Sequence, residues 1–196
     1  HLATSKEDIL AASRDLIKEN GWAAVSIRAV ASRCSVSAGT IYNYYESKAD
    51  LLSDTIESIW HEIFFHPEDE QIFHDVESCI SWIYERLEYG NRQFPGFFSL
   101  HSFGFMRDEK TSGKKRMMKT WGHILNGLCE VLENDPKVRA DVFDQEFTEK
   151  KFADILFSLI LVSMIRQDYD PSSVLMLVKK TLYVTVQSQA KFQKQV

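Results

Sequence analysis

Two neighbouring stretches decide the fold of this chain: Ser26-Ile27-Arg28-Ala29-Val30-Ala31, and Val36-Ser37-Ala38-Gly39-Thr40-Ile41-Tyr42-Asn43-Tyr44-Tyr45-Glu46-Ser47-Lys48-Ala49-Asp50-Leu51. In the first, Ile27, Val30 and Ala31 have the spacing of one helix face. In the second, the helical period places Ile41, Tyr44 and Tyr45 on one side and Gly39, Tyr42 and Asn43 on the other. A serine precedes each run as a helix N-cap, at Ser26, Ser37 and Ser47. The sequence therefore predicts two short helices joined by a tight turn, then a longer helix.

Longer helices are predicted on both sides of this pair. An apolar stripe predicts a helix over about residues 5–20, which Asn20-Gly21 would end, and another predicts a helix over about 47–66. Short helices flanked in this way form a helix-turn-helix, whose second helix enters the DNA major groove. A compact three-helix bundle without DNA binding fits the same spacing, so geometry alone leaves both interpretations open.

The remainder of the chain also has helical periodicity and shows no sustained period-two alternation. It predicts an all-α protein of about nine helices, with a helix-turn-helix domain over 1–50 and a helical domain over 51–196. The further helices are expected at about 70–91, 96–106, 109–134, 145–168 and 171–192.

Bulk composition neither favours DNA binding nor indicates a membrane protein or an enzyme. The net charge is −5, while residues 1–50 are neutral, so a DNA-binding function must rest on local motifs. The longest apolar stretch, 155–165, is far shorter than the roughly 20 residues of a membrane span, and no secretory signal is visible. We therefore expect a cytoplasmic protein that has no membrane partner.

Metal, disulfide and catalytic motifs are also missing from the sequence. The three cysteines form no C-x-x-C pair, and His61-Glu62 with His66 is one residue too long for H-E-x-x-H. No nucleophile, base and orienting group stand together, so we expect no enzyme, no metal site and no cofactor.

The two quoted stretches closely resemble the DNA-binding signature of the TetR family of bacterial transcriptional regulators, over about residues 5–55. The resemblance implies contacts to a double-stranded DNA operator, and it implies packing roles for Tyr44 and Tyr45. One departure is Cys34-Ser35, where the family usually has Ala-Gly, so a residue other than glycine is expected in a left-handed conformation. The DNA-binding residues so implied are Ser26, Arg28, Ser37, Ala38, Gly39, Thr40, Tyr42, Asn43 and Lys48.

The same resemblance implies that residues 51–196 bind a small-molecule effector and form a homodimer. The last two predicted helices are apolar around more of their circumference than packing on one side requires, which favours a four-helix interface between two chains. The candidate interface residues are Phe152, Ile155, Leu159, Val162, Val174, Val178 and Leu182. Two-fold symmetry would call for a palindromic operator.

A concentration of aromatic residues predicts a mainly hydrophobic effector pocket. Five Phe and a Met fall between Phe94 and Met106, too many for one buried stripe, although a filled core would account for any one of them. The candidate pocket residues are Trp82, Phe97, Phe98, His101, Phe105, Met118, Trp121 and Leu125.

The resulting expectation is a DNA-binding regulator, a repressor in the family's usual mode, released from its operator by that effector. Two alternatives remain open. One is a helical ligand-binding or interaction protein with a non-functional helix-turn-helix, and the other is a helical enzyme that carries an incidental one.

Overall fold

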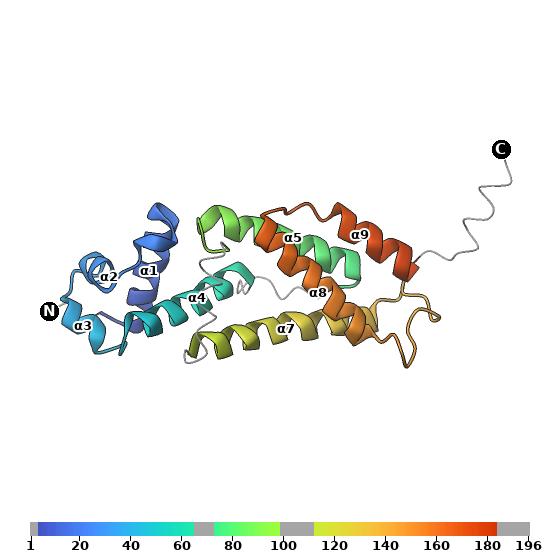
Figure 1. Ribbon diagram of the computed structural model, residues 1–196, viewed down its shortest axis with the longest axis horizontal. Helices are drawn as coiled ribbons and strands as arrows, with labels where there is room; N and C mark the ends of the chain where they lie inside the picture. The colour runs from blue at the N-terminus through green and yellow to red at the C-terminus, as the bar shows by residue number, and fades with distance from the viewer. Residues whose placement is uncertain (1–3, 65–72, 99–111, 184–196) are drawn as a thin grey trace. The chain divides into compact units, whose positions relative to one another are not determined.

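The computed structural model describes residues 4–64, 73–98 and 112–183, and within 112–120 it describes the helix without the side chains (Figure 1). This part of the chain contains helices and no β-strand, which confirms the all-α prediction. Eight α-helices are described, one fewer than the nine expected over the whole chain. They are α1 (Lys6–Asn20), α2 (Ile27–Arg33), α3 (Ala38–Tyr42), α4 (Lys48–Phe64), α5 (Val76–Gln93), α7 (Ser112–Asn134), α8 (Glu149–Arg166) and α9 (Ser172–Val178). A 3₁₀ turn, η1 (Trp22–Ala24), follows α1, and a π-helical turn, η3 (Lys179–Tyr183), follows α9.

The chain divides into two compact units. One comprises residues 1–69 and 86–122, and the other comprises 70–85 and 123–196. Helix α4 lies wholly in the first unit, so the two compact units do not divide at residue 50. The domain boundary expected there stays a prediction. None of the described helices is long and apolar enough to cross a membrane.

The predicted serine caps are confirmed at the starts of α2, α3 and α4. The Oγ atoms of Ser26, Ser37 and Ser47 accept hydrogen bonds from backbone N–H groups three residues later, at 3.1, 3.2 and 3.2 Å. At α1, Ser5 and Asp8 form a reciprocal capping box. Each bond satisfies an N–H group that has no partner within its helix, so local sequence fixes where these helices begin.

The turn between α2 and α3 contains the expected left-handed residue. Ser35 has φ +56°, its N–H donates to the carbonyl of Ser32, and the Val36 N–H donates to the carbonyl of Ala31. This hydrogen-bond pattern is the Schellman motif, which usually has glycine at the left-handed position. Serine there costs about 1 kcal/mol, which the fold tolerates because the apolar residues of α2 and α3, among them Val30 and Ile41, are buried.

A small apolar core holds the helix-turn-helix together. Ile9 and Ile17 of α1, Val30 of α2, Ile41 of α3 and Leu51 of α4 are completely buried. Burying side chains of this size contributes roughly 1.5–3 kcal/mol each, which offsets the weak intrinsic stability of helices as short as α2 and α3. The core therefore fixes which faces of α2 and α3 remain outside.

Three helix boundaries in the rest of the chain differ from those expected. Helix α5 begins at Val76 instead of 70 because Asp75 caps it, accepting a hydrogen bond from the Ser78 N–H at 2.7 Å. Helix α8 begins at Glu149 because Thr148 is its N-cap, and α9 passes into η3 after Val178. Residues 96–98 of the helix expected over 96–106 form a turn, and the others lie outside the described residues.

Candidate nucleic-acid interface

Helix α3 presents its polar face to solvent. Ile41 is completely buried, whereas Tyr42 is 54% exposed and Gly39 and Asn43 are also exposed. This division is the one expected from the helical period. Tyr42 and Asn43 are thus free to contact a partner, and the absence of a side chain at Gly39 lets that partner approach the backbone closely.

Three of the predicted contact residues already perform a local structural role. Ser26 and Ser37 use their hydroxyl oxygens as N-caps, and the Thr40 Oγ1 lies 3.1 Å from the Ser37 Oγ. Ser37 is nevertheless exposed, and Ser26, Ala38 and Thr40 are half-buried. The backbone around these residues is therefore fixed before any partner binds.

The six Lys and Arg residues of the described segment 4–64 fall into two groups. Four of them form ion pairs at distances of 2.5–3.3 Å. The pairs are Lys6 with Asp54, Arg14 with Glu7 and Glu62, Lys18 with Glu62, and Arg33 with Glu19. Arg28 and Lys48 are both exposed, and no ion pair with another described residue involves either of them.

These two cations stand near the start of α2 and at the start of α4. An unpaired cation displaces counterions when it meets a phosphate, whereas a paired one must first lose its carboxylate. The first turn of α4 adds N–H groups and the positive end of the helix dipole beside Lys48. In Figure 1 the start of α4 lies next to α3, at the end of the unit where the chain begins.

Tyr44 differs from what the resemblance implies. Tyr45 is buried, as expected of a packing residue, but Tyr44 is 42% exposed and its hydroxyl donates to the backbone carbonyl of Thr4. Helix α3 ends at Tyr42, so the helical period used to place Tyr44 no longer applies there. Tyr44 thus joins Tyr42 as an exposed aromatic side chain beside α3.

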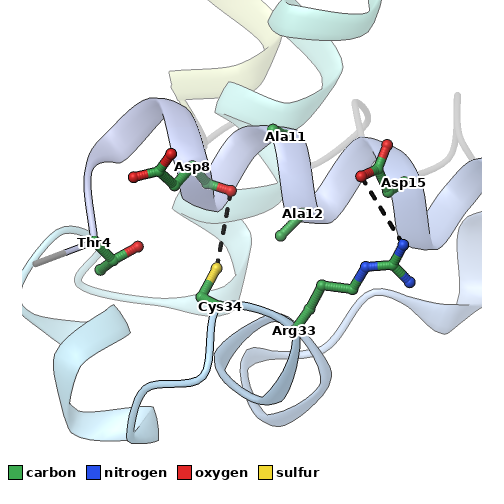
Figure 2. Close-up of a pocket in the computed structure, with 7 residues that line it drawn as sticks. All are labelled: Thr4, Asp8, Ala11, Ala12, Asp15, Arg33 and Cys34. Atoms are coloured by element: carbon green, nitrogen blue, oxygen red, sulfur yellow. Dashed lines mark hydrogen bonds and ion pairs between the residues drawn. The ribbon is translucent and has the colours of Figure 1, made fainter. Parts of the chain in front are cut away.

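An open hollow of about 380 Å³ lies elsewhere in this unit, between α1 and the end of α2 (Figure 2). Asp8 and Asp15 line it, so its carboxylates would repel a phosphate. The Cys34 thiol also lines it, within 3.8 Å of the Asp8 carbonyl oxygen, and partial burial raises the pKa of this thiol. A raised pKa disfavours the reactive thiolate, in keeping with an inert cysteine.

The predicted effector residues are divided between the two compact units. Phe97 and Phe98 are buried and Trp121 is half-buried in the first unit, while Trp82 and Leu125 are half-buried in the second. The indole of Trp82 packs on Phe73, with ring centroids 5.2 Å apart. His101 and Phe105, and the side chain of Met118, lie outside what the structure describes, so the pocket stays a prediction. No cluster of potential metal ligands occurs among the described residues.

The predicted dimer residues differ in how far they are exposed to solvent. Phe152, Val174, Val178 and Leu182 are buried within the chain itself, so their part in an interface stays a prediction. Ile155 and Val162 are each 44% exposed, and Leu159 is half-buried between them on α8. Three further apolar residues of these helices are exposed, namely Ile165, Met176 and Leu177.

Residues 9–55 match the model of a family described as bacterial regulatory proteins, tetR family. Among curated proteins, the chain is 38% identical over 48 residues to the HTH-type transcriptional regulator UidR of Escherichia coli K12, which covers 24% of each chain. The match thus spans about a quarter of that regulator's length.

Solved structures extend the likeness to most of the chain. A transcriptional regulator from Rhodococcus sp. Rha1 aligns with a TM-score of 0.66 at 16% identity, covering 93% of this chain and 100% of that one. FadR from Bacillus subtilis, solved in complex with stearoyl-CoA, aligns with a TM-score of 0.63 at 16% identity, covering 89% and 97%. At these identities, the two structures show that the fold is shared.

Proposed function

We propose that this chain, whose residues 9–55 match the model of the tetR family of bacterial regulatory proteins, binds an operator in double-stranded DNA and represses transcription. Helix α3 enters the major groove, where Tyr42 and Asn43 contact bases and phosphates. Arg28 and Lys48 bind phosphates on either side. The protein acts in the cytoplasm, and no enzymatic step is part of this function.

One observation carries the proposal. Arg28 and Lys48 are exposed and form no ion pair with another described residue, whereas the other four Lys and Arg side chains of residues 4–64 pair with carboxylates. A three-helix bundle that served only as a scaffold would gain nothing from leaving these two charges unpaired. In an acidic protein, they provide a local electropositive site for DNA.

Salt dependence tests this assignment directly. With an operator selected from a random-sequence DNA pool, Lys48→Ala and Arg28→Ala should each weaken binding. Each should also lower the slope of log affinity against log salt by about one for every bound protomer, because one phosphate contact is lost. Fluorescence anisotropy titrations between low and physiological salt would measure the slope.

Arg33→Ala is the matched control, since Arg33 lies on the same helix as Arg28 but is paired with Glu19 at 2.5 Å. Its slope should equal that of the unmodified protein. Operator binding that survived the combined replacement of Tyr42, Asn43 and Lys48 by alanine would sink the proposal.

We further propose that the regulator is a homodimer that uses the exposed apolar side chains of α8 and α9. Ile155, Val162 and Ile165 lie on α8, and Met176 and Leu177 lie on α9. Covering this surface with a second copy removes apolar area from water. A dimer would present two copies of α3 to a palindromic operator, with half-site centres roughly 34–36 Å apart or somewhat more.

Charge substitution distinguishes this surface from the buried residues of the same helices. Val162→Glu should convert the dimer to a monomer, as measured by light scattering, while the helix content measured by circular dichroism is kept. Lys150→Glu, an exposed polar position near the start of the same helix and off the face that carries Ile155 and Val162, should leave the dimer intact. A Val162→Glu protein that remained dimeric would place the interface elsewhere.

For the effector, we propose a flat or chain-like, mainly hydrophobic compound. Support comes from the concentration of Phe, Trp and Met residues already named, and from FadR, which shares this fold and was solved in complex with stearoyl-CoA. A repressor requires the effector to bind the DNA-free form more tightly than the DNA-bound form.

A further inference from the structure

The compact unit that carries the helix-turn-helix also contains a segment from far along the sequence. Residues 86–98, which are the second half of α5 and the turn that follows it, belong to this unit. We call this segment the clamp. It contacts the unit at two places, the end of α4 and the corner between α1 and α2.

At the end of α4, an arginine of the clamp caps the helix. The Arg86 Nε donates to the carbonyl of Ile63, and its Nη2 donates to the carbonyl of Glu62 at 3.3 Å. The guanidinium also lies over the ring of Tyr89, with 4.4 Å between the carbon and the ring centroid. A cation at the negative end of a helix dipole is favourable, and here the guanidinium also donates hydrogen bonds to two carbonyls of the last turn.

At the corner between α1 and α2, the clamp binds through backbone and aromatic contacts. The Trp22 N–H donates to the carbonyl of Pro95 at 3.1 Å, and the ring centroids of Trp22 and Phe97 are 6.0 Å apart. Gly96 has φ +80°, which turns the chain back toward Trp22. Lys18, near the end of α1, lies over the ring of Phe94 at 5.0 Å.

Helices α1 and α4 themselves are joined by a row of polar contacts. Lys6 pairs with Asp54 at 2.5 Å, Arg14 donates to the Ser58 Oγ at 2.9 Å, and Lys18 pairs with Glu62 at 2.6 Å. Together with the apolar core, this row makes α1 and α4 one frame. By comparison, α2 and α3 are short, and α2 begins only five residues after Trp22.

We propose that the clamp sets the position of α2 and α3 on the α1–α4 frame and thereby sets operator affinity, although none of its residues contacts DNA. This inference rests on the proposed DNA-binding function. Helix α5 is continuous, and its first half belongs to the other compact unit.

Arg86→Gln removes the guanidinium from the end of α4 and leaves the DNA-contacting residues unchanged. We expect its operator affinity to fall about tenfold, with a salt slope equal to that of the unmodified protein. The measurement is made well below the melting temperature of the variant, where almost all of it is folded. A purely structural role would therefore lower the melting temperature without changing the affinity.

Arg92→Gln is the matched control, because Arg92 lies on the same helix, is exposed and contacts only Glu88 among the described residues. It should bind the operator like the unmodified protein. If Arg86→Gln does not fold, Trp22→Phe carries the same test at the other contact, where it keeps the backbone hydrogen bond and shrinks the aromatic contact. It too should weaken binding at an unchanged slope.

Several results would overturn the proposal that the clamp sets operator affinity. Unchanged or tighter operator binding by the folded variant would show that Arg86 only stabilises the fold. A lower salt slope would show that Arg86 contacts phosphate. If the unmodified protein selected no DNA at all, the proposed DNA-binding function would be wrong, and so would the role proposed for the clamp. If Lys48→Ala weakened binding and Arg86→Gln did not, the DNA-binding function would stand and only the role proposed for the clamp would be wrong.

Discussion

Asp135→Ala is expected to lower the free energy of unfolding by about 2–4 kcal/mol. Asp135 follows α7 in the second compact unit and is only 5% exposed. Its carboxylate accepts hydrogen bonds from the N–H of Val76 at 2.9 Å, the N–H of Lys137 at 2.8 Å and the hydroxyl of Tyr183. One side chain thereby joins the start of α5, the loop after α7 and the end of η3.

The size of this effect comes from the three hydrogen-bond donors that would lose their acceptor. Without the carboxylate, two backbone N–H groups and a phenol that is already largely shielded from water would have no acceptor, at a cost of about 1–3 kcal/mol for each fully buried group. Asp135→Asn should cost less, because the amide keeps one acceptor oxygen. Thermal and urea unfolding followed by circular dichroism would measure both variants.

Asp144 provides a matched control for Asp135. Its carboxylate also accepts two backbone N–H groups, those of Glu146 and Phe147, but it is exposed. In Asp144→Ala, water can replace the carboxylate, so the loss of stability should be much smaller. Equal losses for the two substitutions would contradict the role of burial.

Gly90→Ala is expected to destabilise the protein by about 1–2 kcal/mol, the opposite of the usual effect of alanine within a helix. Gly90 lies inside α5, where alanine would ordinarily gain about 1 kcal/mol. An added Cβ would, however, come within 2.6 Å of the Ile63 Cδ1, 3.0 Å of its Cγ1 and 3.1 Å of the Phe98 Cζ. Ile63 and Phe98 are both buried, so neither can move aside cheaply.

Gly127→Ala is the control that isolates this packing effect. Gly127 lies within α7, and an added Cβ there would meet no atom within 4 Å. This substitution should stabilise the protein by up to about 1 kcal/mol. Opposite shifts in melting temperature are therefore expected for the two alanines, and a stabilising Gly90→Ala would refute the close approach of α5 to α4.

Local sequence was sufficient for several features of the fold and of the interface. The serine caps of α2, α3 and α4 depend on hydroxyl groups that reach backbone atoms three residues away, so they can be predicted without the tertiary structure. The left-handed Ser35 was expected from the resemblance, because the family usually has glycine at that position. Tyr42 and Asn43 were assigned to the exposed face from the helical period alone.

Other features depend on groups that are distant in sequence. Arg28 and Arg33 look equivalent along α2, yet Arg33 is paired because Glu19 of α1 lies beside it, and Arg28 forms no ion pair within the part of the chain that the structure describes. Phe152 and Ile155 look equally apolar along α8, yet one is buried and the other exposed. The alternation of residue types could not separate them, because α8 is apolar around most of its circumference.

The sequence by itself determined the helical class, the position of the helix-turn-helix and the face that α3 presents, because each follows from periodicity and capping within a few residues. Only the tertiary structure decided which cations stay unpaired, which apolar residues remain on the surface, and that residues 86–98 pack with the helix-turn-helix. Charge pairing and burial depend on which helices become neighbours. Which helices become neighbours depends on the packing of the whole chain, between residues too far apart in the sequence for a local pattern to show.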